Sequence, residues 1–310
     1  QILIDGAPIR IKNPNDAKKA GLGFVPEDRK LQGLVLPFSV EANISMASFD
    51  KFTRFGFINQ AREREIGERQ ARALAVVKAD AYGHGAVRMA EEYEALGADW
   101  LALSNIEEAL QVRRAGIKLP LLVLGYTPAE AADVLAENDI AQCAYSAEYC
   151  AALSENAVKS GVKVKIHVKV DTDMSRLGFY FQDIERDKEA VSVVAEACRR
   201  PGLIPEGIFT HFAVADGGEN GKAFTLKQFS CFMALIVELE KQGITFKIHH
   251  CANSGAILDY PEMHLDMVRA GVILYGMEPS LCVEHHADFR PVLSLHSVIS
   301  HVKEIEPGSD

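Results

Sequence analysis

The chain lacks several features that would assign it to a class at once. It has no run of five or more basic residues, and 33 Lys and Arg stand against 43 Asp and Glu, which gives a formal net charge of -10. An acidic chain of this kind repels a phosphate backbone, which argues against a nucleic-acid partner. It shows no signal-peptide pattern and no long uncharged apolar segment, so we expect a cytoplasmic protein without a membrane partner.

Cysteines are few, and none stands at a metal-binding spacing. The six cysteines are scattered without a C-x-x-C pair, and the histidine doublets at 249–250 and 285–286 stand alone. Disulfide frameworks and zinc sites both need such residues at repeated short spacings. We therefore expect reduced thiols and no metal.

From residue 75 onward, short apolar runs alternate with amphipathic stretches of helical period. The runs predict strands at 75–79, 100–104, 121–125, 140–144, 164–170, 206–211, 246–251 and 267–270. Helices between them begin at caps such as Asn105 and end at glycines such as Gly97 and Gly243. Eight such units predict an α/β fold, a closed (β/α)8 barrel of the TIM type. A doubly wound open sheet is the alternative, but its G-x-G-x-x-G fingerprint follows none of these strands.

Polar residues gather where these predicted strands end. Lys78 closes the first strand, Lys169 and Asp171 close the fifth with Arg176 in the next loop, and His211 closes the sixth. His250, Asn253 and Ser254 lie at or after the end of the seventh, and Arg269 with Gly271 ends the eighth. Any one of them alone is better explained as a cap or a hydrogen-bonded structural residue. A barrel, however, carries its chemistry at the carboxyl ends of its strands. Their joint placement therefore predicts an active site.

Lys78 is the most informative of these residues. It ends an apolar run in the segment AVVKADAYGHG, where an ammonium is costly unless its pKa falls, it is paired or it is used covalently. A lysine amine can bond covalently to the aldehyde of pyridoxal 5'-phosphate. Tyr82 follows four residues later, within reach of the phosphate of such a group. The nonapeptide VKADAYGHG resembles the pyridoxal lysine motif of alanine racemases.

Four further segments resemble blocks of bacterial alanine racemases in the same order. They are VKVDTDMSRLGF from residue 168, FTHFAVAD from 209, HCANSGA from 250 and MVRAGVILYGMEPS from 267. The resemblance covers the chain from about Leu74 to its last residue. It implies a barrel that binds pyridoxal phosphate (PLP) and interconverts L- and D-alanine for cell-wall precursors, and it implies a homodimer.

The resemblance also implies a role for each candidate residue. Lys78 would hold the cofactor aldehyde and then act as one racemisation base, with Arg176 and His211 as the other catalytic candidates. The cofactor contacts would be Lys78, Tyr82, Arg176, His211, His250, Asn253, Ser254, Arg269, Gly271 and Val272. Of these, Tyr82, Ser254, Gly271 and Val272 would hold the phosphate. Lys169 aligns with a lysine that is carbamylated in some members and would then supply an anion for Arg176.

Arg269 separates racemisation from other pyridoxal chemistry. The resemblance places it at the pyridine nitrogen with His250 behind it. A carboxylate there would keep the nitrogen protonated, whereas an arginine cannot accept a proton. We therefore expect proton removal and return at Cα with little transamination. A decarboxylase of basic amino acids with the same type of barrel is the alternative enzyme, although such enzymes usually have an acidic residue at this place. A barrel that holds the cofactor without turnover is the alternative outside enzymes.

The loop DTDMSRLG departs from the family pattern. Family members usually have glycine at the places of Asp173 and Ser175. Glycine takes a positive φ freely, Asp tolerates it moderately and Ser less well. We therefore expect the aim of Arg176 to differ from that in the family.

The two ends of the chain divide it further. Residues 1–70 resemble part of a sugar-import ABC transporter ATPase, but G-x-x-x-x-G-K-[ST] and LSGG are both absent, so a remnant without ATP binding is a further alternative. Residues 71–289 form the predicted barrel. Residues 290–310 resemble the first strand or two of the family's second, β domain. That domain supplies a tyrosine base to the partner subunit, and no tyrosine follows Tyr275 here. We therefore expect impaired racemisation.

Overall fold

The computed structural model describes residues 2–4, 7–9, 53–54, 57–58 and 71–307. The chain divides into two units, Gln1–Gln70 and Ala71–Asp310. In the first unit, β1 (Ile2–Ile4) pairs antiparallel with β2 (Ala7–Ile9), and β3 (Thr53–Arg54) pairs antiparallel with β4 (Phe57–Ile58). Most of the segment predicted to resemble a transporter ATPase lies outside the described residues. That prediction stays untested.

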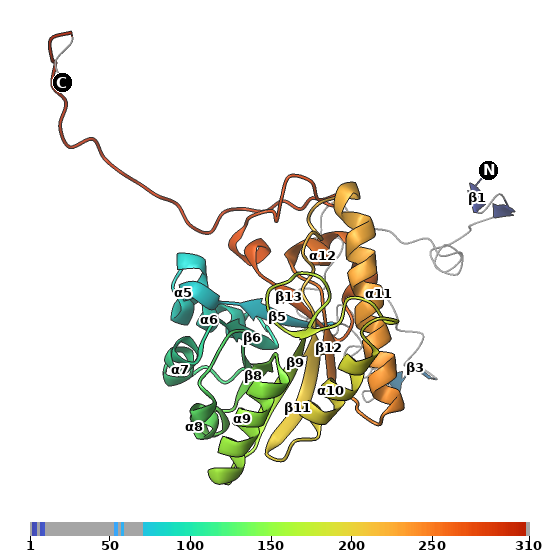
Figure 1. The fold of residues 1–310 in the computed structure, drawn as a ribbon. Coiled ribbons are helices and arrows are strands. Elements are labelled where there is room, and N and C mark those ends of the chain that lie inside the picture. The colour runs from blue at the N-terminus through green and yellow to red at the C-terminus, as the bar shows by residue number, and fades with distance from the viewer. Residues whose placement is uncertain (1, 5–6, 10–52, 55–56, 59–70, 308–310) are drawn as a thin grey trace. The chain divides into compact units, whose positions relative to one another are not determined.

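Eight parallel strands form the centre of the second unit (Figure 1). They are β5 (Arg72–Val76), β6 (Trp100–Leu103), β7 (Leu121–Val123), β8 (Ile140–Ala144), β9 (Val164–Asp171), β11 (Leu203–Phe209), β12 (Ile248–His250) and β13 (Met267–Ala270). Their hydrogen-bonded order runs β12-β11-β9-β8-β7-β6-β5-β13, and the short β10 (Phe179–Tyr180) pairs with β9 beside this path.

The two end strands of this order lie next to each other. Asp266 donates its backbone N–H to the carbonyl of His249 at 3.1 Å, and Arg269 donates to the carbonyl of Ala252 at 2.9 Å. These bonds join the ends of β12 and β13, so the sheet curves into a nearly closed barrel. The predicted barrel architecture is therefore confirmed, and an open doubly wound sheet is wrong.

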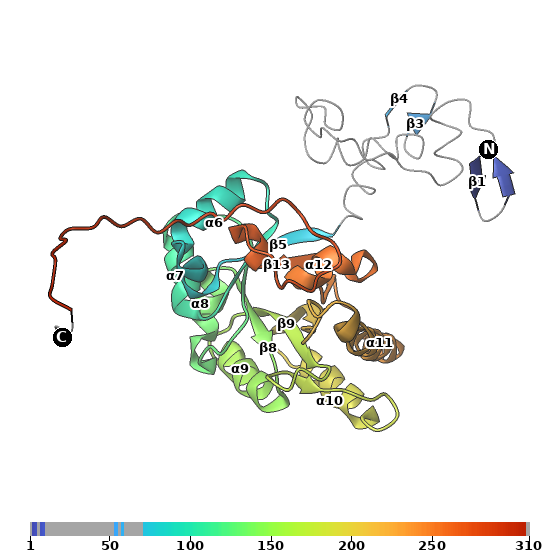
Figure 2. The ribbon, with the colours of Figure 1, turned by 90° about the horizontal axis from the view of Figure 1, so that it is seen from above.

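Helices follow the strands and cover the outside of the barrel (Figure 2). They are α5 (Lys78–Gly83), α6 (Ala86–Ala95), α7 (Ile106–Arg114), α8 (Ala132–Glu137), α9 (Ala147–Lys159), α10 (Lys188–Cys198), α11 (Glu219–Lys241) and α12 (Ser254–Asp259), with 3-10 turns η3 (Ala129–Ala131), η4 (Pro261–Met263) and η5 (Val272–Tyr275). The predicted cap Asn105 accepts the N–H of Glu108 at 2.9 Å. None of the helices in the described ranges is long and apolar enough to cross a bilayer.

Two apolar clusters hold these layers together. Alternate strand residues face the barrel interior, where they form a small cluster of Leu74, Val76, Trp100, Ala102, Leu122, Ala141, Ile248 and Met267. The intervening strand residues pack outward against the helices in a larger cluster, as Leu101 and Leu121 do. This alternation is the period of two that a strand imposes on its side chains. Burial on both faces explains why the strands read as continuous apolar runs.

The structure corrects two of the predicted strand boundaries. The first strand was expected at 75–79 but ends at Val76, because Ala79–Tyr82 adopt positive φ and cannot continue an extended chain. The sixth was expected at 206–211 but spans Leu203–Phe209, so His211 lies in the loop beyond its end.

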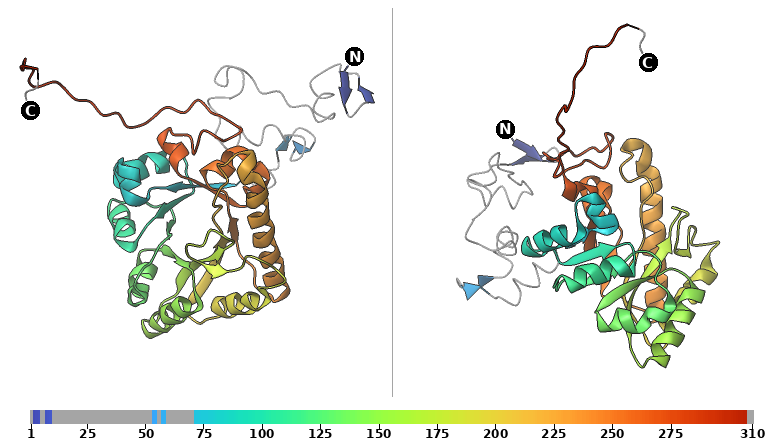
Figure 3. Two further views of the ribbon diagram at one scale, coloured as in Figure 1. Left: turned by 45° about the horizontal axis from the view of Figure 1, so that its top comes forward. Right: turned by 90° about the vertical axis from the view of Figure 1, so that its left-hand side faces the viewer.

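The predicted strand after residue 290 is absent from the described part of the segment. Residues 290–307 contain no helix or strand (Figure 3). Leu295 is 96% exposed and Val298 87%. An alternating apolar pattern forms a strand only beside another strand, and none of the described strands pairs with this segment.

We expect Leu122→Ala to lower the free energy of unfolding by about 2–5 kcal/mol, because Leu122 is fully buried inside the barrel and its loss leaves a cavity. Leu96→Ala is the matched control, since Leu96 is 75% exposed, and its effect should stay within about 0.5 kcal/mol. Urea unfolding followed by circular dichroism measures both. Equal losses in the two variants would contradict the assignment of the barrel interior.

Candidate active site

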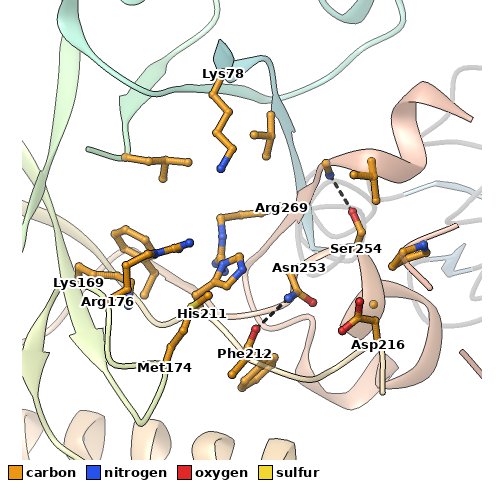
Figure 4. Close-up of a pocket in the computed structure, with 18 of the residues that line it drawn as sticks. Lys78, Lys169, Met174, Arg176, His211, Phe212, Asp216, Asn253, Ser254 and Arg269 are labelled. Carbon is orange, nitrogen blue, oxygen red and sulfur yellow. Dashed lines mark hydrogen bonds between the residues drawn. The ribbon is translucent and has the colours of Figure 1, made fainter. Parts of the chain in front are cut away.

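A cavity of about 470 Å³ opens at the carboxyl ends of the barrel strands (Figure 4). Ten of the predicted site residues line it: Lys78, Tyr82, Lys169, Arg176, His211, Asn253, Ser254, Arg269, Gly271 and Val272. They lie at or beyond the carboxyl ends of β5, β9, β11, β12 and β13, which are far apart in the sequence. His250 does not line the cavity but contacts Arg269 from behind.

Lys78 reaches the cavity from an unusual backbone. It begins α5, in which Ala79, Asp80, Ala81 and Tyr82 have φ between 52° and 55°, so the turn is left-handed. Each non-glycine residue in this conformation costs about 1–2 kcal/mol, and the surrounding structure must compensate. Asp80 accepts the N–H of Ala86 at 2.7 Å, which ties the turn to the start of α6. The turn brings both Lys78 and Tyr82 into the cavity.

Burial lowers the pKa of the Lys78 amine. The nearby Arg176 guanidinium lowers it further, and Glu108 opposes both effects. Relative to a solvent-exposed lysine, more of the amine is therefore unprotonated near neutral pH. Only the unprotonated amine is a nucleophile or a base. Lys78 is thus prepared for the covalent role that its motif predicts.

Two hydroxyls and a backbone N–H come together where three segments meet. The N–H of Gly271 donates to the Ser254 hydroxyl at 3.0 Å. A Cβ at Gly271 would stand 3.0 Å from the Tyr82 hydroxyl and 3.4 Å from that of Ser254, so glycine lets both hydroxyls approach this backbone without being displaced. Asn253 caps α12 by accepting the N–H of Ala256 at 3.1 Å and holds Ser254 in place. Hydroxyls and backbone N–H groups of this kind suit a phosphate.

Arg269 is buried and has only neutral partners among the described residues. It donates to the carbonyls of Thr210 at 2.8 Å and Cys251 at 3.0 Å, and to the Nδ1 atoms of His250 at 3.1 Å and His211 at 3.3 Å. Burial lowers the pKa of Arg269 to about 10, so it remains cationic at neutral pH.

The histidines around Arg269 complete its environment. Burial, followed by the Arg269 charge, holds the pKa of both His211 and His250 well below the usual value. Both imidazoles are therefore neutral, and their Nδ1 atoms accept from Arg269. Nε2 of His250 then carries the proton and donates to Nδ1 of His167 at 2.9 Å. This chain fixes the orientation of the guanidinium.

Arg176 lies on a strained loop that begins at the end of β9. Oδ1 of Asp171 accepts the N–H groups of Asp173, Met174 and Ser175 at 3.0–3.2 Å. Asp173 and Ser175 have φ of 91° and 57°. These are the two places where the sequence departs from glycine, and the backbone there has the positive φ that glycine would favour.

Lys169 is a second lysine in the same cavity. It is 3% exposed, and Nζ donates to the carbonyl of Val170 at 2.6 Å. Burial lowers its pKa to about 8. Carbamylation of Lys169 stays a prediction, as do the roles of the other site residues.

Several residues around the cavity were missed by the sequence reasoning. They include Ser104, Leu124, Gly125, Met174, Leu177, Phe209, Phe212 and Asp216. Ser104 and Gly125 follow the second and third strands, so their position was a usable signal. The apolar residues carry no such signal, because the apolar residue types that line a cavity are the same as those that fill a core.

The comparisons with known proteins agree with this geometry. The model of the alanine racemase N-terminal domain matches residues 58–279. An alanine racemase of Desulfovibrio desulfuricans is 46% identical over 233 residues, which cover 75% of this chain and 61% of that protein. One of Clostridium tetani is 44% identical over 236 residues, which cover 76% and 59%. The chain therefore spans less than two thirds of the length of these relatives.

Solved structures show the same likeness. An alanine racemase of Clostridium difficile 630 superposes with a TM-score of 0.64 at 41% identity, covering 69% of this chain and 57% of that one. A histidine racemase of Leuconostoc mesenteroides reaches a TM-score of 0.63 at 28% identity, covering 72% and 58%. The family match begins at residue 58, inside the segment predicted to resemble a transporter ATPase.

We expect Ser175→Gly to raise the free energy of unfolding by about 0.5–1 kcal/mol, because relief of the left-handed strain exceeds the entropy that glycine adds to the unfolded chain. Ser175→Ala keeps the Cβ and therefore the strain, and should bring no such gain. Thermal unfolding of both variants is the measurement. A gain in Ser175→Ala that equals the gain in Ser175→Gly would show that the hydroxyl, not the backbone, is the source.

Proposed function

Because the chain belongs to the alanine racemase family, we propose that it interconverts L- and D-alanine with pyridoxal phosphate bound at the carboxyl end of its barrel. The observation that carries the proposal is the cavity shared by Lys78 and Arg269. Lys78 offers an amine of lowered pKa, and Arg269 offers a cation whose hydrogen-bond partners are all neutral. The product would serve as cytoplasmic D-alanine for cell-wall precursors.

The residues around the cavity fit the cofactor of this family. Tyr82, Ser254, Gly271 and Val272 would hold its phosphate, and their hydroxyls and backbone already meet at one place. Lys78 would hold its aldehyde carbon. Arg269 would face the ring nitrogen and Arg176 the ring hydroxyl. When bound, the cofactor supplies an electron sink that acidifies the substrate Cα–H.

The described side chains account for the proton transfer on one face of the substrate. Lys78 takes and returns the Cα proton, and its lowered pKa keeps part of the amine unprotonated for this purpose. Arg269 can donate a hydrogen bond to the ring nitrogen but cannot give up its own proton readily or accept another. It therefore favours return of the proton to Cα.

Racemisation also needs a group on the opposite face. Tyr82 is the only tyrosine among the described residues that line the cavity, and its hydroxyl lies beside Gly271. The second base expected from the family resemblance, a tyrosine of the partner subunit, stays a prediction. The homodimer and the impaired turnover of this chain stay predictions.

Two alternatives differ in chemistry from alanine racemisation. A basic amino-acid decarboxylase is not favoured, since the relatives described above are racemases and the family resemblance implies the buried cation Arg269, not an acidic residue, at the ring nitrogen. The structural likeness to a histidine racemase supports a second candidate, a racemase for another amino acid. Alanine remains the proposed substrate because the more similar relatives are named alanine racemases.

We expect Lys78→Ala to abolish the cofactor adduct that borohydride fixes to the wild-type chain, because the adduct forms at the Lys78 amine. Lys169→Ala is the control, since Lys169 lines the same cavity, and it should keep the adduct on Lys78. Peptide mass spectrometry locates the adduct. An adduct on Lys169 in the wild-type chain would remove Lys78 from its assigned role.

We expect the cofactor-loaded chain in D2O to exchange the Cα hydrogen of at least one alanine enantiomer, because this step needs Lys78 alone. Exchange in Lys78→Ala should fall by about 10²- to 10⁴-fold, the usual contribution of one proton-transfer group. Proton NMR follows the exchange, with histidine as comparison substrate. A loaded chain that exchanges neither amino acid would be a cofactor-binding module, and CO2 released from lysine or ornithine would identify a decarboxylase.

A further inference from the structure

Glu108 joins two segments beside Lys78. It is the third residue of α7, and its two carboxylate oxygens bind different backbones. Oε2 accepts the N–H of Ser104 at 2.9 Å, and Oε1 accepts the N–H of Ala79 at 3.0 Å. Ser104 lines the cavity after β6, and Ala79 follows Lys78 directly. One carboxylate therefore fastens the start of the left-handed turn to the end of the neighbouring strand.

Helix capping explains only half of this arrangement. Asn105 is the N-cap of α7 and accepts the N–H of Glu108 at 2.9 Å. In such a motif the glutamate side chain reaches back to a backbone N–H at the helix start, and here it reaches that of Ser104. The bond to Ala79 has no part in the cap, because Ala79 lies 29 residues earlier in the chain.

The turn needs this support. Ala79 is the first of four consecutive residues at positive φ, a conformation that persists only where the surrounding structure enforces it. Asp80 secures the far end of the turn through the N–H of Ala86. Glu108 secures the near end, and it is the only acceptor for the Ala79 N–H among the described residues.

The Glu108 carboxylate also acts on Lys78 through its charge. Burial and Arg176 lower the pKa of Lys78, and Glu108 raises it. Loss of the carboxylate should therefore increase the unprotonated fraction of the Lys78 amine at neutral pH while it loosens the backbone that aims the amine.

We propose that Glu108 is a positioning residue for the Lys78 amine, which it holds in the cavity through the backbone N–H of Ala79. The Glu108 carboxylate also opposes, through its charge, the effect of burial on the basicity of the Lys78 amine. Glu108 contacts neither substrate nor cofactor in this account. The inference rests on the proposed function only in that Lys78 binds the cofactor and transfers the proton. The hydrogen bonds of Glu108 do not depend on that function.

The test is the pH dependence of the rate at which pyridoxal phosphate forms its borohydride-fixed adduct with Lys78, in the full chain freed of cofactor by hydroxylamine. The midpoint of this profile reports the protonation of the amine, and the plateau at high pH reports its placement. In Glu108→Ala we expect a lower midpoint and a plateau lower by about tenfold, the order of effect expected for the loss of one hydrogen bond to a charged group.

Two further variants separate charge from geometry. Glu108→Gln removes the charge but keeps one acceptor for two N–H donors, so we expect the same lowered midpoint and an intermediate plateau. Glu107→Gln is the matched control, because Glu107 is the exposed neighbour in the same first turn and loses the same charge. It should change neither midpoint nor plateau. Circular dichroism confirms that each variant is folded, and Glu108→Gln decides the question if Glu108→Ala does not fold.

A midpoint that moves equally in Glu107→Gln and Glu108→Gln would overturn the proposal, since any charge at the start of α7 would then suffice. An unchanged plateau in folded Glu108→Ala would overturn it as well. A chain that shows the expected profiles but exchanges no alanine Cα hydrogen would refute the proposed function and leave the role of Glu108 standing.

Discussion

The left-handed turn of Ala79–Tyr82 is the constraint on which the cavity depends. At about 1–2 kcal/mol for each of its four residues, the turn is among the costliest local features of the chain. A longer strand after Val76 would carry Tyr82 away from Lys78. The turn instead brings the amine and the hydroxyl into one cavity, and it persists because Glu108 and Asp80 hold its two ends.

Positive charge predominates among the described side chains that line the cavity. Four cationic side chains, Lys78, Lys169, Arg176 and Arg269, line it with a single acidic one, Asp216, among the described residues. Burial lowers the pKa of both lysines and of Arg269 because a low-dielectric site disfavours each charge. An excess of partly desolvated cations favours an anionic ligand. The backbone and hydroxyls at Gly271 provide a second, uncharged attraction for a phosphate, so two independent features select the same class of group.

Much of the fold was accessible from periodicity. The eight apolar runs predicted eight strands because parallel strands are buried on both faces, and six of these strands overlap their predicted ranges closely, as at Ile140–Ala144 and Met267–Ala270. The errors arose where the pattern depends on partners elsewhere. The resemblance after residue 290 predicted a strand or two, but a strand needs a neighbour to bond with, and none of the described strands pairs with this segment. At the first strand, the apolar run continued past Val76, whereas the backbone turned left-handed.

The site divides in the same way. The sequence by itself predicted which residues share the site, because their types and their places at strand ends are local properties, and the motif around Lys78 is long enough to identify a family. Only the tertiary structure decided how these residues act together. It showed Arg269 with solely neutral partners, positive φ at Asp173 and Ser175, and a carboxylate of α7 bonded to the residue after Lys78. Such relations join segments that are distant in the chain, and hydrogen bonding, burial and backbone strain exist only once the barrel has brought those segments together.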